Sequence, residues 1–147
     1  MAPEPPEIAI VDDDMDFLEL YRHVLESRGY RVRCFGTPAA ALEGMAQSRP
    51  DLVISDLMME RLDAGFSFAR QVKSDERFRG VPVIIATAAG SQRGFDFRPR
   101  GAADLAAMNA DAFFAKPVDP EALLAKIREL VSARAASSDG TGRKEGA

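Results

Sequence analysis

The sequence has few of the residues that build disulfides and zinc sites, and it has no long apolar run. Its single cysteine, Cys34, cannot form a disulfide within the chain. One cysteine and one histidine cannot supply the ligands of a zinc site either. The N-terminus lacks the basic start and the apolar stretch of a signal peptide, and the apolar runs are far shorter than a membrane span. We therefore expect a cytoplasmic protein with no membrane insertion.

The sequence also lacks a strong excess of either charge. Its 19 basic and 23 acidic residues give a formal net charge of −4. Because there is no global basic field, we do not expect direct binding to nucleic acid. The 147 residues, of which 46% are apolar and 29% are charged, fit one globular domain with a substantial core.

Short apolar runs alternate with amphipathic segments along the chain. The runs predict strands at 7–11, 31–35, 51–55, 81–87 and 112–115. The segments between and after them predict helices at 15–30, where Gly29 is the stop signal, and at 37–48, 65–73, 101–109 and 119–133. Such alternation predicts right-handed crossovers and an α/β fold, in which a doubly wound, five-stranded parallel sheet is covered by helices on both faces.

Polar residues follow the predicted strands, and in such sheets ligands bind beyond the carboxyl ends of the strands. Asp12 and Asp13 follow the first strand, Asp56 the third, Thr87 the fourth and Lys116 the fifth. Each residue alone could be an ordinary turn or strand-end residue. Together, three carboxylates repel one another unless a cation joins them, and Mg²⁺ prefers such oxygen ligands. With a lysine and a hydroxyl nearby, the set indicates a phosphoryl-transfer site in which Asp56 is the nucleophile.

Four segments carry a resemblance to a known family. "IVDDD", "LVISDLMM", "VPVIIATAA" and "DAFFAKPVDP" resemble, in order, the signature segments of the response-regulator receiver domain of two-component signalling, in the CheY-like superfamily. The resemblance implies a flavodoxin-like (βα)5 fold with strand order 2-1-3-4-5. We expect residues 1–6 to be a short lead, 7–133 the receiver domain and 134–147 a disordered tail.

The resemblance also implies the roles of the site residues. Asp56 would be the phosphoacceptor, and Lys116 would bind the phosphoryl group. The implied cofactor is Mg²⁺, with side-chain ligands from Asp12, Asp13 and Asp56 and a backbone carbonyl ligand from Met58.

The implied function is signalling through protein contacts. A sensor histidine kinase or phosphotransfer protein would donate the phosphoryl group from a phosphohistidine. Thr87 and Phe113 would be the switch residues that change a surface recognised by a phospho-dependent downstream protein. The domain would promote its own phosphorylation and dephosphorylation without being a turnover enzyme on a separate substrate. The chain would be a stand-alone receiver or a fragment of a longer protein.

The chain departs from the family pattern in two loops. It reads "ERLDAGF" where the family usually has a Pro-Gly turn after the phosphoacceptor, and the segment before the fourth helix is extended at 89–101. Aromatic and arginine side chains commonly anchor interfaces, and this extension contains several. The candidate partner contacts are Arg93, Phe95, Phe97, Arg98 and Arg100.

Two other functions stay open at this point. A pseudo-receiver would be a protein-binding module of the same fold that is never phosphorylated, although such modules typically lose one or more of the site residues. A metal-dependent phosphohydrolase would use an aspartyl nucleophile, but it usually has a second acid where this chain has Met58. His23 could carry a phosphoryl group, but a structural role within a helix is favoured. Cys34 is expected to face inwards as a small hydrophobic residue.

Overall fold

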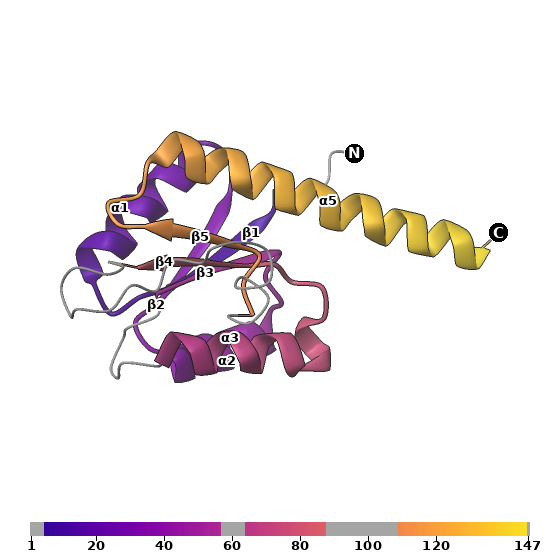
Figure 1. Ribbon diagram of the computed structural model, residues 1–147, viewed down its shortest axis with the longest axis horizontal. Helices are drawn as coiled ribbons and strands as arrows, with labels where there is room; N and C mark the ends of the chain where they lie inside the picture. The colour runs from indigo at the N-terminus through magenta and orange to yellow at the C-terminus, as the bar shows by residue number, and fades with distance from the viewer. Residues whose placement is uncertain (1–4, 57–63, 88–108, 147) are drawn as a thin grey trace.

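The computed structural model describes residues 5–56, 64–87 and 109–146, with side chains described at 5–56, 68–87 and 109–133. Its centre is a parallel sheet in the order β2-β1-β3-β4-β5, as the resemblance implied (Figure 1). The strands are β1 (Glu7–Val11), β2 (Arg31–Phe35), β3 (Leu52–Ser55), β4 (Val83–Thr87) and β5 (Ala112–Ala115). The predicted strands are therefore confirmed, with β3 and β4 beginning one and two residues later than expected.

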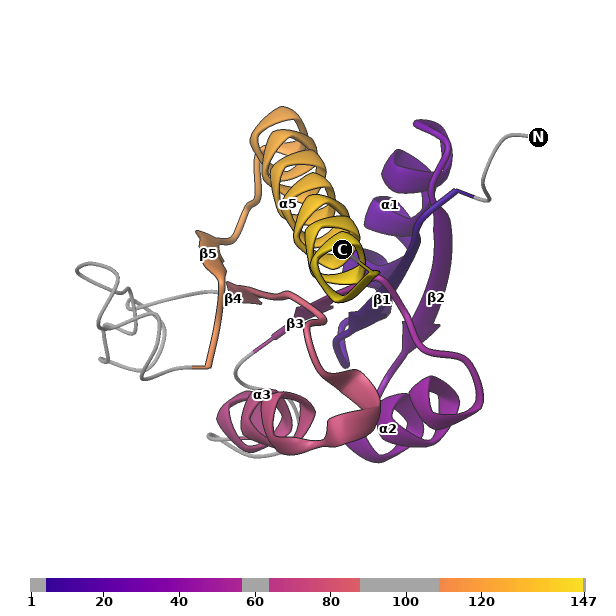
Figure 2. The ribbon, with the colours of Figure 1, turned by 90° about the vertical axis from the view of Figure 1, so that its right-hand side faces the viewer.

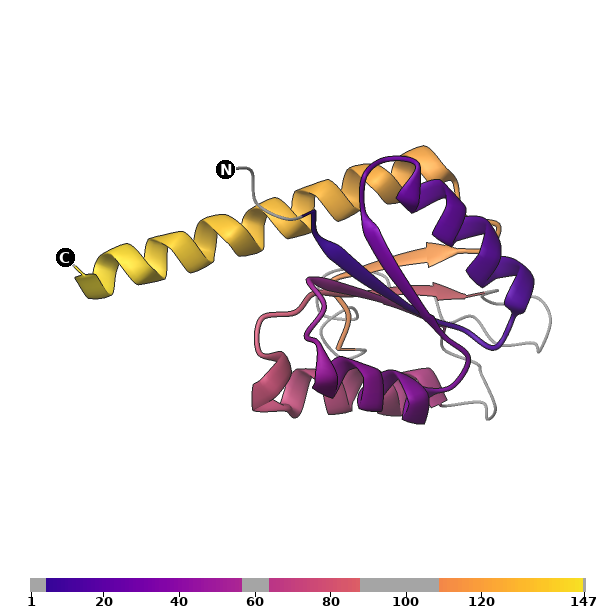
Figure 3. The same ribbon diagram turned by 180° about the vertical axis from the view of Figure 1, so that it is seen from behind.

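Helices cover both faces of the sheet. They are α1 (Met15–Glu26), α2 (Pro38–Gln47), α3 (Ala64–Ser74) and α5 (Pro120–Gly146), with a short 3-10 helix, η1, at Glu76–Phe78. Helices α1 and α5 lie on one face, and α2 and α3 lie on the other (Figures 2 and 3). The predicted helix at 101–109 falls outside the described residues except for Asn109, which is in a turn with a φ of 59°.

Local sequence signals explain where two of these helices begin and one ends. The side chain of Asp14 caps α1 by accepting hydrogen bonds from the backbone N–H groups of Asp16 and Phe17. Thr37 caps α2 in the same way, directly before Pro38. Helix α1 ends at Glu26, and Gly29 then turns the chain toward β2 with a φ of 92°, a conformation that favours glycine.

The alternating side chains of the strands form two apolar layers. Ile8, Ile10 and Ile54 face the layer under α1 and α5. Ala9 and Val11 face the layer over α2 and α3. Burial on both faces explains why the inner strands are apolar except at their end residues Glu7, Ser55 and Thr87. The sheet therefore fixes where the residues that directly follow each strand lie.

Two residues singled out in the sequence occupy ordinary positions. Cys34 is half-buried, and its thiol packs against the layer beneath α1 and α5, as predicted. Burial raises the pKa of this thiol. His23 is exposed on α1.

Helix α5 is longer than predicted. Its backbone is helical to Gly146, whereas the predicted last helix ended at residue 133. No proline follows Pro120, and Ala135 and Ala136 are strong helix formers, which explains why the helix continues past residue 133. Gly140 and Gly142 are weak helix formers, so propensity does not explain the last turns. The C-terminal half of α5 projects beyond the sheet (Figure 1). No described helix, α5 included, has both the length and the apolar character needed to cross a bilayer.

The projecting part of α5 is expected to contribute little to stability. Among the described side chains of this helix, the buried ones are Leu123, Leu124 and Ile127. A chain ending after residue 133 should therefore keep its free energy of unfolding to within about 0.5 kcal/mol of the parent. Its far-UV circular dichroism should show less helix. Urea unfolding checks this, and a markedly lower midpoint would mean that residues 134–146 pack against the domain.

Candidate functional site

The five polar residues predicted from the sequence lie at the carboxyl edge of the sheet. Asp12 and Asp13 directly follow β1, Asp56 follows β3, Thr87 ends β4 and Lys116 follows β5. Hydrogen bonds from backbone N–H groups continue the strand pairing into the site. The Asp56 N–H donates to the carbonyl of Val11 at 3.0 Å, and the Lys116 N–H donates to the carbonyl of Thr87 at 2.8 Å. The sheet therefore sets the spacing of these side chains.

Three carboxylates meet at this edge. Asp12, Asp13 and Asp56 each offer an oxygen atom, and these atoms lie within 4.8 Å of one another. Asp12 is fully buried, Asp56 is 7% exposed, and Asp13 faces solvent. The cluster is therefore accessible from the side of Asp13.

One ammonium group lies against the cluster. The Nζ atom of Lys116 is 2.7 Å from Oδ2 of Asp12 and 3.7 Å from Oδ2 of Asp56. The first contact is a charge-assisted hydrogen bond, while the second is a looser ion pair. The Lys116–Pro117 peptide bond is cis. In this state the lysine favours Asp12 over the proposed phosphoacceptor.

The environment of Asp12 opposes its ionisation. Burial is the largest cause, and it raises the pKa of Asp12 to about 6, with a smaller contribution from the charge of Asp56. The Lys116 ammonium and the Asp14 backbone N–H, which donates to Asp12 at 2.9 Å, act in the opposite direction. The available hydrogen bonds therefore do not fully compensate for the burial of this carboxylate.

The donor set fits a magnesium ion. Three ionised carboxylates beside one ammonium group leave negative charge at the described part of the edge, and a divalent cation would balance it. The side chains offered are all carboxylates, which suit Mg²⁺, and one of them is exposed, so bound water and phosphate oxygens could complete the coordination. The site therefore has the chemistry that the sequence predicted for Mg²⁺.

Two further predicted residues adjoin the acids. The Thr87 hydroxyl is buried and forms no hydrogen bond with any described residue. A buried hydroxyl without a hydrogen-bond partner costs about 1–3 kcal/mol of stability. A new acceptor placed within reach of this hydroxyl would remove that cost. Phe113 is half-buried and packs against the core layer over α2 and α3. The remaining predicted site residues lie outside the described residues: Met58, Arg93, Phe95, Phe97, Arg98 and Arg100.

An aromatic pair on α1, which was not predicted from the sequence, also adjoins the site. The ring of Phe17 lies under the Lys116 ammonium, with Nζ 4.3 Å from the ring centroid. Tyr21 follows one helical turn later, and its hydroxyl donates a hydrogen bond to the backbone carbonyl of Val118. Phe17 and Tyr21 are spaced as residues on one face of a helix, but this spacing contains no signal of what they contact.

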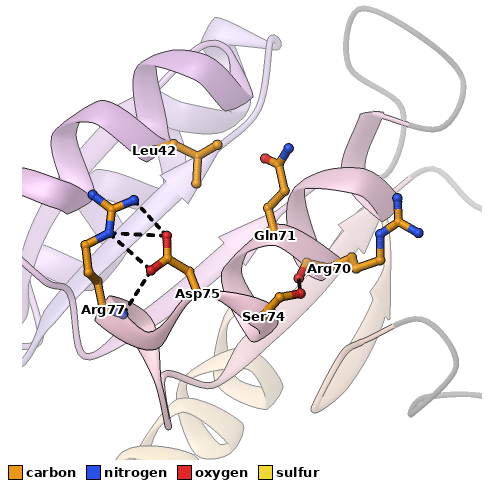
Figure 4. Close-up of a pocket in the computed structure, with 6 residues that line it drawn as sticks. All are labelled: Leu42, Arg70, Gln71, Ser74, Asp75 and Arg77. Atoms are coloured by element: carbon orange, nitrogen blue, oxygen red, sulfur yellow. Dashed lines mark hydrogen bonds and ion pairs between the residues drawn. The ribbon is translucent and has the colours of Figure 1, made fainter.

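A separate surface cavity of about 390 Å³ lies between α2 and the α3–η1 segment (Figure 4). Some of its polar side chains have hydrogen-bond partners within the lining. Asp75 accepts hydrogen bonds from the Arg77 guanidinium, and the Ser74 hydroxyl donates to the carbonyl of Arg70. The cavity shares no residue with the carboxylate cluster. The cavity is therefore separate from the acidic edge that was predicted from the sequence.

The raised pKa of Asp12 predicts a pH-dependent stability in metal-free buffer. Asp12 favours the folded state most strongly when protonated, below its ordinary pKa near 4, and this contribution is lost as the pH rises through about 6. The rise of the Asp12 pKa from near 4 to about 6 corresponds to about 3 kcal/mol of the free energy of unfolding. Between about pH 4 and pH 7, Asp12→Asn should therefore gain about this much stability relative to the parent. Urea unfolding in chelator at both pH values checks this, and a difference independent of pH would contradict it.

The family model of the response regulator receiver domain matches residues 8–128. Response regulator Rre1 of Synechocystis sp. is 34% identical over 141 residues, covering 92% of this chain and 56% of the relative. Response regulator MprA of Mycolicibacterium vanbaalenii is 36% identical over 140 residues, covering 94% of this chain and 55% of the relative. The chain thus spans about half the length of these curated relatives.

A solved structure agrees with these matches. The signal receiver domain of a signal transduction histidine kinase from Syntrophus aciditrophicus superposes with a TM-score of 0.71 at 30% identity, covering 87% of this chain and 91% of that chain. A CheY-like receiver domain from Methanospirillum hungatei, at 24% identity and a TM-score of 0.75, shares the fold over 90% of this chain and 98% of its own. This chain therefore belongs to the receiver domain family of two-component response regulators.

Proposed function

We propose that this receiver domain accepts a phosphoryl group on Asp56. One observation supports this above all others, namely the position of Asp56 beside two more carboxylates and 3.7 Å from the ammonium of Lys116. A carboxylate in such a setting can act as a nucleophile, while the surrounding charges stabilise the transferring group. Members of the family are signalling modules and not turnover enzymes on a separate substrate.

The chemical step follows from these positions. An oxygen of Asp56 would attack the phosphorus atom of a phosphohistidine on a partner kinase, or of a small phosphodonor. A bond to the donor nitrogen or oxygen would break as the acyl phosphate bond forms. Lys116 would neutralise the oxygens of the transferring group. Mg²⁺ would be held by Asp12, Asp13 and Asp56, and we propose that the Met58 carbonyl binds it as well. The ion would supply further positive charge.

The product would change two neighbouring side chains. The buried hydroxyl of Thr87, which has no partner among the described residues, would donate a hydrogen bond to the new phosphoryl oxygens. Its movement would free space next to β5, into which Phe113 would repack. We propose that this alters the surface near β5 and α5, which a phospho-dependent downstream protein would then recognise.

The partners follow from the same chemistry. A sensor histidine kinase or a phosphotransfer protein would supply the phosphoryl group, and slow hydrolysis of the acyl phosphate on the domain itself would end the signal. One curated relative is named a DNA-binding dual master transcriptional regulator, RpaA of Synechocystis sp., and this chain spans 49% of its length. We propose that the domain described here acts through protein contacts rather than by binding DNA itself.

Phosphorylation by acetyl phosphate tests this function. With Mg²⁺, intact-mass spectrometry should show at most one phosphoryl group per chain, and hydroxylamine should remove it because it is an acyl phosphate. The adduct should not form in chelator. No adduct under any condition would favour a pseudo-receiver that acts only as a protein-binding module.

A further inference from the structure

The Lys116 ammonium lies between carboxylates on one side and an aromatic ring on the other. Its Nζ is 2.7 Å from Asp12, 3.7 Å from Asp56 and 4.3 Å from the centroid of the Phe17 ring. A cation within about 6 Å of a ring centroid is attracted by the electron-rich face of the ring, and most strongly where water is excluded. Phe17 is 8% exposed and the Lys116 side chain 18%, so this contact is largely shielded from water.

The position of the Phe17 ring is itself fixed. Phe17 lies in the first turn of α1, where its backbone N–H donates to the capping carboxylate of Asp14 at 3.3 Å. Tyr21 packs against it, with the two ring centroids 4.5 Å apart. The Tyr21 hydroxyl donates to the carbonyl of Val118, two residues after Lys116. The aromatic pair therefore contacts both the side chain of the lysine and the backbone that follows it.

This inference rests on the phosphoacceptor role proposed for Asp56. We propose that Phe17 is a positioning residue for phosphoryl transfer, because its ring holds the Lys116 ammonium within reach of Asp56 while Tyr21 anchors the segment that carries the lysine. The ammonium already lies near both carboxylates, at 2.7 Å from Asp12 and 3.7 Å from Asp56, and it has three N–H donors to share between Asp12 and a phosphoryl group on Asp56. The Phe17 ring attracts the cation at this position without offering a competing hydrogen-bond acceptor. It confines a flexible side chain to the region above the acids.

Phe17→Leu tests the role of the ring, because leucine keeps an apolar side chain but has no aromatic face. With saturating Mg²⁺, the rate of Asp56 phosphorylation by acetyl phosphate should fall about three- to tenfold, as expected for loss of a largely buried cation–π contact. Phe17→Tyr keeps a ring and should restore most of the rate. Phe78→Leu is the matched control, because Phe78 is also buried beneath a cation, Arg77, but lies outside the site. Its rate should equal that of the parent.

Two further measurements separate positioning from general packing. The ε-methylene protons of Lys116 should resonate upfield of those of Lys73 and Lys126 in the parent and in Phe78→Leu, but not in Phe17→Leu. In a Lys116→Ala background, Phe17→Leu should cause no further loss of rate, because the contact is already absent.

Three results would overturn the role of Phe17. These are a Phe17→Leu rate equal to that of the parent, an equal loss of rate in the Lys116→Ala background, or an unshifted Lys116 resonance in the parent. Failure of the proposed function is distinguishable from these results. In that case the parent itself would acquire no phosphoryl group on Asp56, while the resonance would still report where the ammonium lies.

Discussion

Asp56→Asn is expected to abolish phosphorylation by acetyl phosphate and by a partner kinase. An amide oxygen is a far weaker nucleophile than a carboxylate, and it would also be a weaker metal ligand. The substitution removes one of three carboxylates that lie within 4.8 Å of one another, so the metal-free variant should be at least as stable as the parent. Intact-mass spectrometry and urea unfolding of the same sample show whether activity is lost without loss of the fold.

Asp14→Asn is the matched control for this substitution. Asp14 is exposed and next to the cluster in sequence, but its side chain caps α1 rather than facing the acids. Asparagine caps helices about as well as aspartate, so this variant should be phosphorylated like the parent. Phosphorylation of Asp56→Asn at the rate of the parent would show that another residue is the acceptor.

Magnesium binding is expected to stabilise the folded protein strongly. A ligand that binds only the folded state adds about 2.7 kcal/mol at a concentration 100 times its dissociation constant. Thermal unfolding of the parent should therefore shift to higher temperature as Mg²⁺ is added. Asp13→Asn should remove most of this gain, because it deletes the exposed ligand of the cluster while leaving the buried ones in place.

Asp16→Asn shows whether this effect depends on the cluster. Asp16 is another exposed acid in the first turn of α1, but it is not part of the carboxylate cluster. Its replacement should leave the Mg²⁺-dependent rise in melting temperature unchanged. If the parent's melting temperature does not respond to Mg²⁺, the metal site is assigned wrongly.

The sequence predicted the sheet well because its strands are short apolar runs that end at polar residues. The bounds of β1, β2 and β5 match the prediction residue for residue. The end of α5 was not predictable in the same way. After residue 133 the sequence loses its apolar periodicity, which removes the evidence for packing but does not forbid a helical backbone.

The site was predictable where it depends on the ends of strands. Parallel strands deliver Asp12, Asp56 and Lys116 to one edge, so their proximity follows from the topology alone. The contact between Phe17 and Lys116 depends instead on how α1 and the segment after β5 pack in three dimensions. A helical pattern shows which residues face inwards, but it does not identify the side chain that each one meets.

Borohydride trapping tests most directly whether Asp56 is the phosphoacceptor. An acyl phosphate on aspartate is reduced to homoserine, which marks the modified position permanently for peptide sequencing by mass spectrometry. After phosphorylation with acetyl phosphate and Mg²⁺, we expect homoserine at residue 56 and at no other aspartate, with none in the sample treated with chelator. Homoserine at Asp12 or Asp13, or a phosphorylated chain that yields none at residue 56, would contradict the assignment of Asp56 as the phosphoacceptor.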